Sequence, residues 1–131
     1  MISDTLSFTL KVRNQEEALA FYTEKLGFEK RADTSMGGGM RWLTIAPRDS
    51  KVEFVLQPPD WFQGEEQEQH IAGIGKSPTI VFRVGNCSET CATLSERGVE
   101  IIDPATDTGY GVQAVIKDLY GNGLVLLERP F

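Results

Sequence analysis

The stretch LSFTLKVRNQEEALAFYTEKLGF, residues 6–28, carries the local signals that decide the fold. Polar and apolar side chains alternate through its first eight residues, which predicts a half-buried β-strand. Asn14 then stands three residues before Glu17, a pair typical of a helix start because both side chains can bind backbone N–H groups that the helix leaves free. Apolar residues follow at helical spacing, and Gly27 is placed to end the helix.

The same order of signals returns 72 residues later, which is the spacing from Asn14 to Asn86. Alternation over residues 79–84 precedes Asn86, Glu89 follows three residues on, and a helix stop follows in turn. Internal self-similarity indicates duplicated modules. We therefore expect each half to form a strand, then a helix, then further strands.

Three more strand candidates follow in each half. They are residues 28–32, 40–46 and 51–56 in the first half, and residues 99–102, 112–117 and 123–128 in the second. The order is β-α-β-β-β twice, with module one over about residues 5–57 and module two over about residues 78–129 of a single domain, 1–131. The polar connector, residues 58–77, is expected to carry one short helix near residues 60–63.

Composition restricts the function. Thirteen basic and nineteen acidic side chains give a net charge of −6, which disfavours a nucleic-acid partner. No apolar run has the length of a membrane span, and the first residues lack a signal-peptide pattern. Cys87 and Cys91, spaced i, i+4, are expected to be reduced thiols that pack in the fold. These features predict a cytoplasmic protein with no membrane partner.

One β-α-β-β-β module cannot bury both faces of its sheet. Two modules are therefore expected to form a curved mixed sheet of the α+β class, with helices on the outside and a central groove. Concave surfaces of this kind bind small molecules.

These residues resemble a known family. Residues 12–22, together with residues 26–28 at the end of the same segment, look like the opening module of the vicinal oxygen chelate superfamily. This superfamily includes glyoxalase I, the extradiol dioxygenases and the bleomycin resistance proteins. Residues 117–122, KDLYGN, are similar to the Asp-Pro-Asp-Gly-Asn turn of the family, with Leu119 and Tyr120 replacing its middle pair. The resemblance covers residues 6–129 and implies the same fold.

The resemblance also locates the positions at which metal-dependent members carry His and Glu ligands. In this chain they are Ser7, Glu53, Thr79 and Val125, two pairs again separated by 72 residues. One carboxylate, two hydroxyls and an aliphatic side chain make a poor ligand set for a catalytic first-row metal. We expect no metal and no cofactor, and we expect the four side chains to gather around a common hollow.

Glu53 is the one acid in this group, and two interpretations stay open. It is either a polar anchor for a ligand, or a general base with a raised pKa. Alternatively, it forms a salt bridge to Arg41, Arg83 or Lys11, or is solvated in an open groove.

Other side chains have weaker signals. Trp42 either lines a ligand groove or packs in the core, and Trp61 is expected to be exposed, as a lid on a groove or against another subunit. Thr9 and Gln113 share the groove phase of their strands. The lone histidine, His70, is expected in a surface loop.

The leading hypothesis is a metal-free small-molecule-binding protein, a homodimer, with antibiotic sequestration of the bleomycin-resistance type as the closest analogy. The candidate ligand-binding residues are Ser7, Thr9, Trp42, Glu53, Thr79, Gln113 and Val125. The alternative is a lyase, isomerase or dioxygenase of the same superfamily with a degenerate or non-standard metal site. A third hypothesis is a protein-association module with a filled groove.

Overall fold

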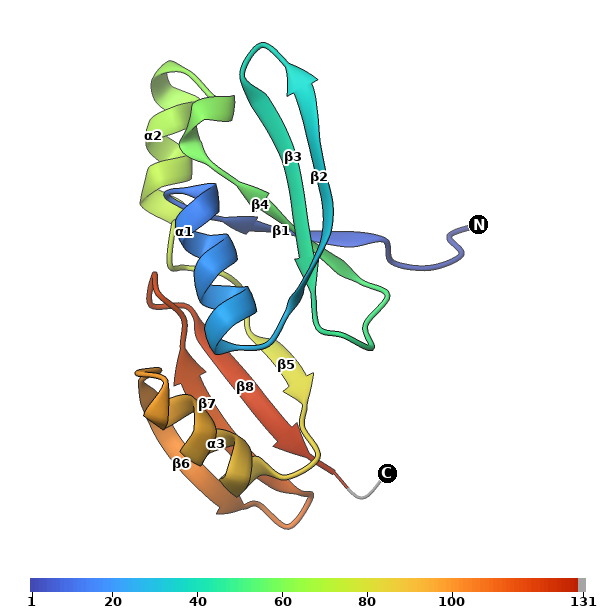
Figure 1. Cartoon of the computed structure of the whole chain (residues 1–131), viewed down its shortest axis with the longest axis vertical. Coiled ribbons are helices and arrows are strands. Elements are labelled where there is room, and N and C mark those ends of the chain that lie inside the picture. Colours follow the sequence, from blue (N-terminus) through green and yellow to red (C-terminus); the bar gives the residue numbers. More distant parts are fainter. Residues whose placement is uncertain (130–131) are drawn as a thin grey trace. The chain divides into compact units, whose positions relative to one another are not determined.

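The computed structural model describes residues 1–129, which form two four-stranded sheets with helices (Figure 1). The chain divides into two units, Met1–Gly75 and a second that begins at Lys76. Each unit contains one strand-helix-three-strand module, and each sheet is mixed. The α+β class and the duplicated order of elements predicted from the sequence are confirmed.

The first unit contains one sheet and most of the helical segments. Its elements are β1 (Ser7–Lys11), α1 (Gln15–Ala20), the π-helical turn η1 (Phe21–Lys25), β2 (Glu29–Gly37), β3 (Met40–Ala46), β4 (Glu53–Gln57), the 3₁₀ turn η2 (Pro59–Trp61) and α2 (Gly64–Gly73). The strand order is β1-β4-β3-β2. β1 pairs with β4 in parallel, and the other neighbours are antiparallel.

The second unit repeats this topology. Its elements are β5 (Ile80–Arg83), α3 (Cys87–Glu96), β6 (Ile101–Asp107), β7 (Val112–Lys117) and β8 (Gly123–Glu128). The strand order β5-β8-β7-β6 again places the first and last strands side by side and parallel.

The helix boundaries follow the predicted signals. The Asn14 side-chain oxygen accepts a hydrogen bond from the Glu17 N–H at 2.9 Å, and Asn86 accepts the equivalent bond from Glu89 at 3.0 Å. Gly27 has φ of +78°, a left-handed conformation that ends the helical turn at little steric cost. Within residues 1–129, no helix is long and apolar enough to cross a membrane.

An aromatic cluster joins α1 and η1 to one face of the first sheet. Tyr22 is fully buried and meets the ring of Phe28 edge-on, with centroids 5.1 Å apart. Phe28 contacts Phe54 at 5.8 Å, and Phe54 contacts Phe8 at 5.5 Å. Edge-to-face contacts of this kind add about 0.5–1.5 kcal/mol each beyond the burial of apolar area. The cluster therefore decides which face of the sheet the helix covers.

The core of the second unit is aliphatic. Leu124 and Leu126 of β8 and Ala114 and Ile116 of β7 are buried on one face of the sheet. Cys87 at the start of α3 is a buried free thiol, and burial, with the neighbouring Cys91, raises its pKa to about 11. Cys87 therefore acts as a packing residue, as expected from the sequence.

The connector differs from its prediction. The expected short helix near residues 60–63 is present as the 3₁₀ turn η2 over Pro59–Trp61, whereas the longer helix, α2, which begins at Gly64, was not predicted. The first turns of α2 are the glutamate and glutamine run of residues 65–69, which reads as a polar loop by composition. Glu and Gln are nevertheless good helix formers.

Gly111 tests the close approach of the β6–β7 hairpin to β8. Its φ is +147°, and a Cβ added there would lie 2.5 Å from the carbonyl oxygen of Glu128. We expect Gly111→Ala to lower the free energy of unfolding by about 1–3 kcal/mol in urea denaturation. The control Gly85→Ala, at an ordinary φ with nothing within 4 Å of the added Cβ, should stay within about 0.5 kcal/mol of the parent.

Candidate functional site

Strand register divides the first sheet into a helix-covered face and a second face. Phe8 and Phe54 lie opposite each other on the helix-covered face. Ser7 lies opposite Glu53. Thr9 and Thr44 both lie opposite Val55. Because side chains alternate along a strand, the residues of these last pairs lie together on the second face, which is the one opposite Phe8 and Phe54. The structure thus brings Ser7, Thr9 and Glu53 together, as the sequence predicted for this module.

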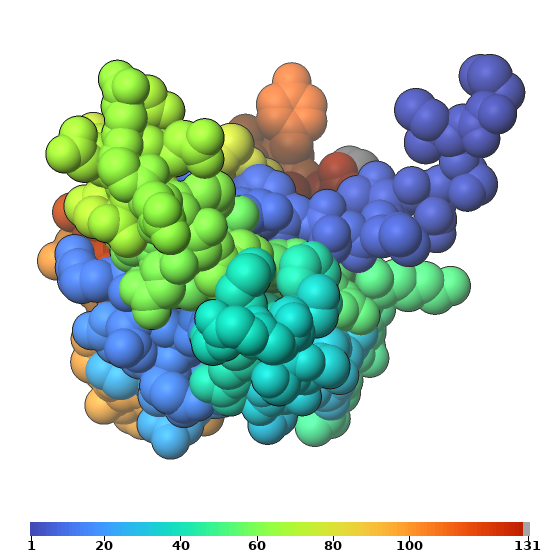
Figure 2. Space-filling view, turned by 90° about the horizontal axis from the view of Figure 1, so that it is seen from above, coloured from blue at the N-terminus to red at the C-terminus, as the bar shows by residue number. Residues whose placement is uncertain are grey.

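Trp42 joins the same face, because it lies two residues before Thr44 on β3. Its indole is stacked on that of Trp61 from η2, with centroids 6.1 Å apart and planes 8° from parallel. Trp42 remains 37% exposed, so core packing is the wrong interpretation for it. Figure 2 shows the connector lying beside the β2–β3 hairpin. The two tryptophans therefore form an aromatic wall at one end of the second face.

Glu53 is held by a neutral hydrogen bond. The Thr44 hydroxyl donates to the Glu53 carboxylate over 2.8 Å. Arg41, one of the ion-pair partners considered for Glu53, instead binds Asp33 at 2.7 Å and Glu16. Its hydrogen bonds hold the pKa of Asp33 well below the ordinary range. One carboxylate oxygen of Glu53 is thus fixed in direction without being neutralised by Arg41.

The second-unit candidates lie on their own sheet. Gln113 lies opposite Leu127, and Val125 lies opposite both Val81 and Val115, on the face of β7 and β8 away from the buried leucines. Thr79 precedes β5 and is not paired with Val125. The 72-residue spacing would place Thr79 opposite Val125, as Ser7 lies opposite Glu53, but Val81 occupies that place. A shift of two residues along a strand leaves each side chain on the same face of the sheet.

The residues at the metal positions of the family do not fit a metal. In the first module these positions hold the Ser7 hydroxyl and the Glu53 carboxylate, and neutral hydroxyls are poor ligands for zinc or iron. Within residues 1–129, no group of three or more His, Cys, Asp or Glu side chains could hold a metal ion.

His70 is buried, so its predicted surface-loop position is wrong. The side chain lies on α2 with 3% of the residue exposed. Its Nε2 is 2.7 Å from the backbone carbonyl oxygen of Gln57, and its ring lies 5.3 Å from that of Phe62. The polar residues around His70 gave no sign of its burial. The helix α2 nevertheless directs the His70 side chain toward the sheet.

Sequence reasoning missed Thr44 and Gln67. Thr44 was detectable, since it has the same alternation phase on β3 as Trp42. Gln67 had no sequence signal, and only the fold shows that its amide donates to the carbonyl oxygens of Pro59 and Phe62 at 3.1 and 3.0 Å.

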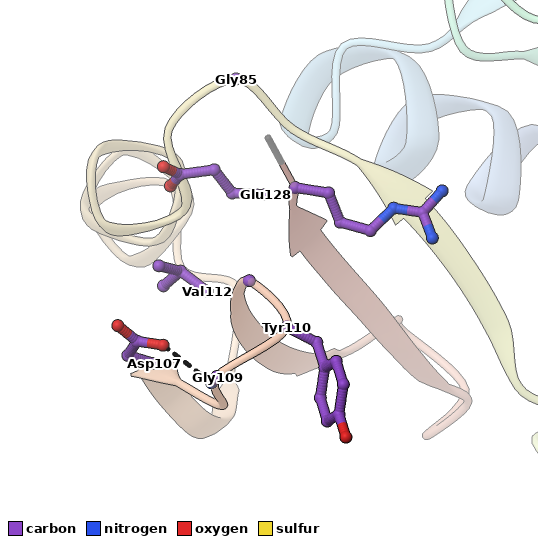
Figure 3. A pocket seen from close by; sticks show the side chains of 8 residues that line it. Gly85, Asp107, Gly109, Tyr110, Val112 and Glu128 are labelled. Carbon is purple, nitrogen blue, oxygen red and sulfur yellow. Dashed lines mark hydrogen bonds between the residues drawn. The ribbon is translucent and has the colours of Figure 1, made fainter. Parts of the chain in front are cut away.

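A separate pocket of about 450 Å³ lies in the second unit (Figure 3). Gly85, Asp107, Tyr110 and Glu128 are among its lining residues. Both acids already accept backbone hydrogen bonds, Asp107 from the Gly109 N–H at 2.9 Å and Glu128 from the first N–H of α3 at 2.8 Å. None of the residues predicted to bind ligand lines this pocket.

A family model described as the Glyoxalase/Bleomycin resistance protein/Dioxygenase superfamily matches residues 6–126. The chain belongs to this superfamily. Its fold is similar to that of UcmS2, with 34% identity and a TM-score of 0.85 over 97% of this chain and 98% of UcmS2. TnmS3, an antibiotic binding protein from Streptomyces sp. CB03234, is 33% identical, with a TM-score of 0.81 over 98% of this chain and 97% of TnmS3.

A Bacillus subtilis (strain 168) protein, YurT, is 33% identical over 120 residues, which are 90% of this chain and 93% of YurT. The resemblance stated from residues 12–28 and 117–122 is therefore confirmed as membership of the superfamily. Members of a superfamily share a fold without sharing a ligand, so the function must be argued from the aromatic wall and Glu53.

The contact between Trp42 and Trp61 can be measured by a double-mutant cycle. We expect Trp42→Leu and Trp61→Leu to couple by about 0.5–1.5 kcal/mol in urea denaturation, because each removes the same stacking contact. The control pair, Trp42→Leu with Phe8→Leu on the opposite face, should be additive within about 0.5 kcal/mol. Additivity of the two tryptophan variants would contradict the stacked arrangement.

Proposed function

We propose that this superfamily member binds and sequesters a small molecule that carries a planar aromatic group and a positive charge, without a catalytic metal. The stacked Trp42–Trp61 pair, on the same sheet face as Glu53, is the observation that carries the proposal. Ser7 and Thr9 supply hydroxyl groups on the same face.

The aromatic part of the ligand is argued from the exposed indole. A partly exposed Trp42 offers apolar area with a π-face, and Trp61 keeps its plane nearly parallel. A wall of this kind favours flat rings, which stack by offset contact of their faces. Cationic rings gain further from the electron-rich indole surface.

The charge of the ligand is argued from Glu53. Its Oε1 accepts from Thr44, which leaves further acceptor capacity on the carboxylate for a ligand donor. Thr44 lies two residues along β3 from Trp42, or about 7 Å at the rise of a strand. Because the Glu53 carboxylate meets the Thr44 hydroxyl, a ligand of about this length can stack on the indole and reach the carboxylate. The net charge of −6 favours a cation at long range as well.

The second module extends the proposal. We propose that Thr79, Gln113 and Val125 also contact the ligand and that the protein is a cytoplasmic homodimer. Two free cysteines suit a reducing compartment. Light scattering after size exclusion tests the dimer, and Val125→Lys, which adds a repelling cation, tests the second module through the affinity for a cationic ligand.

Fluorescence can test the function at the site itself, because Trp42 and Trp61 are the two tryptophans of the chain. We expect bleomycin or the flat cation 9-aminoacridine to quench their emission saturably and raise the melting temperature. Trp42→Leu should weaken binding by about tenfold or more, since each 1.4 kcal/mol of lost stacking is tenfold in affinity.

Two controls complete this test. Glu53→Gln should weaken binding of the cation, whereas Glu24→Gln, on the surface of η1, should leave it unchanged. Cyclohexylammonium has the charge but no flat ring and should not quench. The proposal fails if neither probe alters fluorescence or melting temperature, or if purified protein contains stoichiometric Zn, Ni, Fe or Mn.

A further inference from the structure

We propose that α2 positions Trp61 on Trp42 through His70 and Gln67, and that protonation of His70 releases Trp61 from the stack. His70 and Gln67 are positioning residues, because they act on the ligand wall through Trp61. The consequence for ligand affinity rests on the proposed function, whereas the position of Trp61 can be measured in the ligand-free protein.

The first step is the anchor of α2 on the sheet. The Gln57 carbonyl oxygen can only accept, so the 2.7 Å contact requires the His70 Nε2 to carry the proton. His70 Nδ1 is then a bare acceptor, and it is buried with no hydrogen-bond partner within residues 1–129. A neutral His70 thus connects α2 to the last residue of β4.

The second step is the link from α2 to Trp61. The Gln67 amide donates to the carbonyl oxygens of Pro59 and Phe62, which lie on either side of Trp61 along the chain. The Phe62 ring lies on the His70 ring, with centroids 5.3 Å apart. Both contacts hold the η2 turn to α2, and η2 presents Trp61 to Trp42.

The third step is what a proton on His70 would do. Protonation would convert the buried Nδ1 into a donor with no acceptor and place a charge where water is excluded. Lys11 of β1 adds repulsion, and its ammonium reaches α2 close to Gly73. Movement of α2 away from the sheet relieves both penalties, and Trp61 moves with it.

The charged groups on the elements around His70 are few. They are Lys11 on β1, Glu53 on β4, Asp60 on η2 and the exposed Glu65, Glu66 and Glu68 on α2. Burial is the largest cause that lowers the pKa of His70 below its ordinary value of 6.5, and Lys11 lowers it further, while the bond to Gln57 raises it.

The sign of the pH effect follows from this shift. An unfolded or released His70 takes up a proton at a higher pH than the buried His70 that is bonded to Gln57. The arrangement in which His70 is bonded to Gln57 and Trp61 is stacked on Trp42 therefore has its full stability above pH 6.5. It loses this stability as the pH falls below that value. Ligand binding should weaken over the same pH range, in proportion to the fraction of molecules in which Trp61 is stacked on Trp42.

The experiment measures acrylamide quenching of tryptophan emission in the ligand-free protein at about pH 7.5 and about pH 5.5. We expect the quenching constant to rise at the lower pH while far-ultraviolet circular dichroism stays unchanged. In His70→Gln, whose amide can still donate to Gln57 but does not titrate, the quenching constant should not depend on pH.

Two further variants keep the test decisive if His70→Gln folds poorly. Gln67→Ala should raise the quenching constant at both pH values, whereas Gln69→Ala, an exposed neighbour on α2, should not. Lys11→Gln removes one of the penalties that drive release and should reduce the rise of the quenching constant at the lower pH, whereas Lys51→Gln should leave that rise unchanged.

The outcomes separate the two proposals. A quenching constant that is independent of pH in the parent protein, or one that responds equally in His70→Gln, overturns the positioning role. A His70-dependent response without binding of bleomycin or 9-aminoacridine supports the positioning role and contradicts the proposed function. If 9-aminoacridine binds, its affinity should be about tenfold weaker at the lower pH when Trp61 stays stacked on Trp42 in about one-tenth of the molecules. A pH-independent affinity overturns the release step.

Discussion

The parallel pairing of β1 with β4 is the constraint on which the first module depends. It places Ser7 beside Glu53 at one end of the sheet and Lys11 beside Gln57 at the other. A parallel pair needs a crossover, and α1 supplies it by covering one face. The second face is left with polar side chains and the indole of Trp42, and the connector leaves the sheet at the Gln57 end. The candidate site and the anchor of α2 both follow from this one pairing.

The two faces of that sheet divide stability from recognition. The aromatic cluster of Phe8, Phe28, Phe54 and Tyr22 buries apolar area under the helix. The other face holds one hydrogen-bonded carboxylate and one partly exposed indole. Because the helix-covered face supplies the packing, the second face can vary its side chains without loss of the fold. This separation explains how a superfamily with several chemistries keeps one architecture.

Local signals in the sequence were reliable where local physics decides. The N-cap at Asn14, its copy at Asn86 and the strand alternation depend on residues within a few positions of one another, and all were predicted. Apart from the helix α2, which its polar composition concealed, the errors concern contacts made at long range. The predicted 72-residue equivalence of Ser7 with Thr79 slipped by two residues at β5, because strand pairing, and not sequence spacing, decides which residues lie opposite.

By itself, the sequence determined the duplicated modules and the alternation of most strands, and its resemblance to the superfamily located metal positions that lack a usual ligand set. Periodicity is enough for the modules and the strands, and residue chemistry is enough to judge the ligand set once the resemblance has located it. Only the tertiary structure decided that Trp61 stacks on Trp42, that Thr44 holds Glu53 and that His70 is buried. The physical reason is that these contacts join side chains from different elements, whose distances depend on register and packing rather than on local propensity.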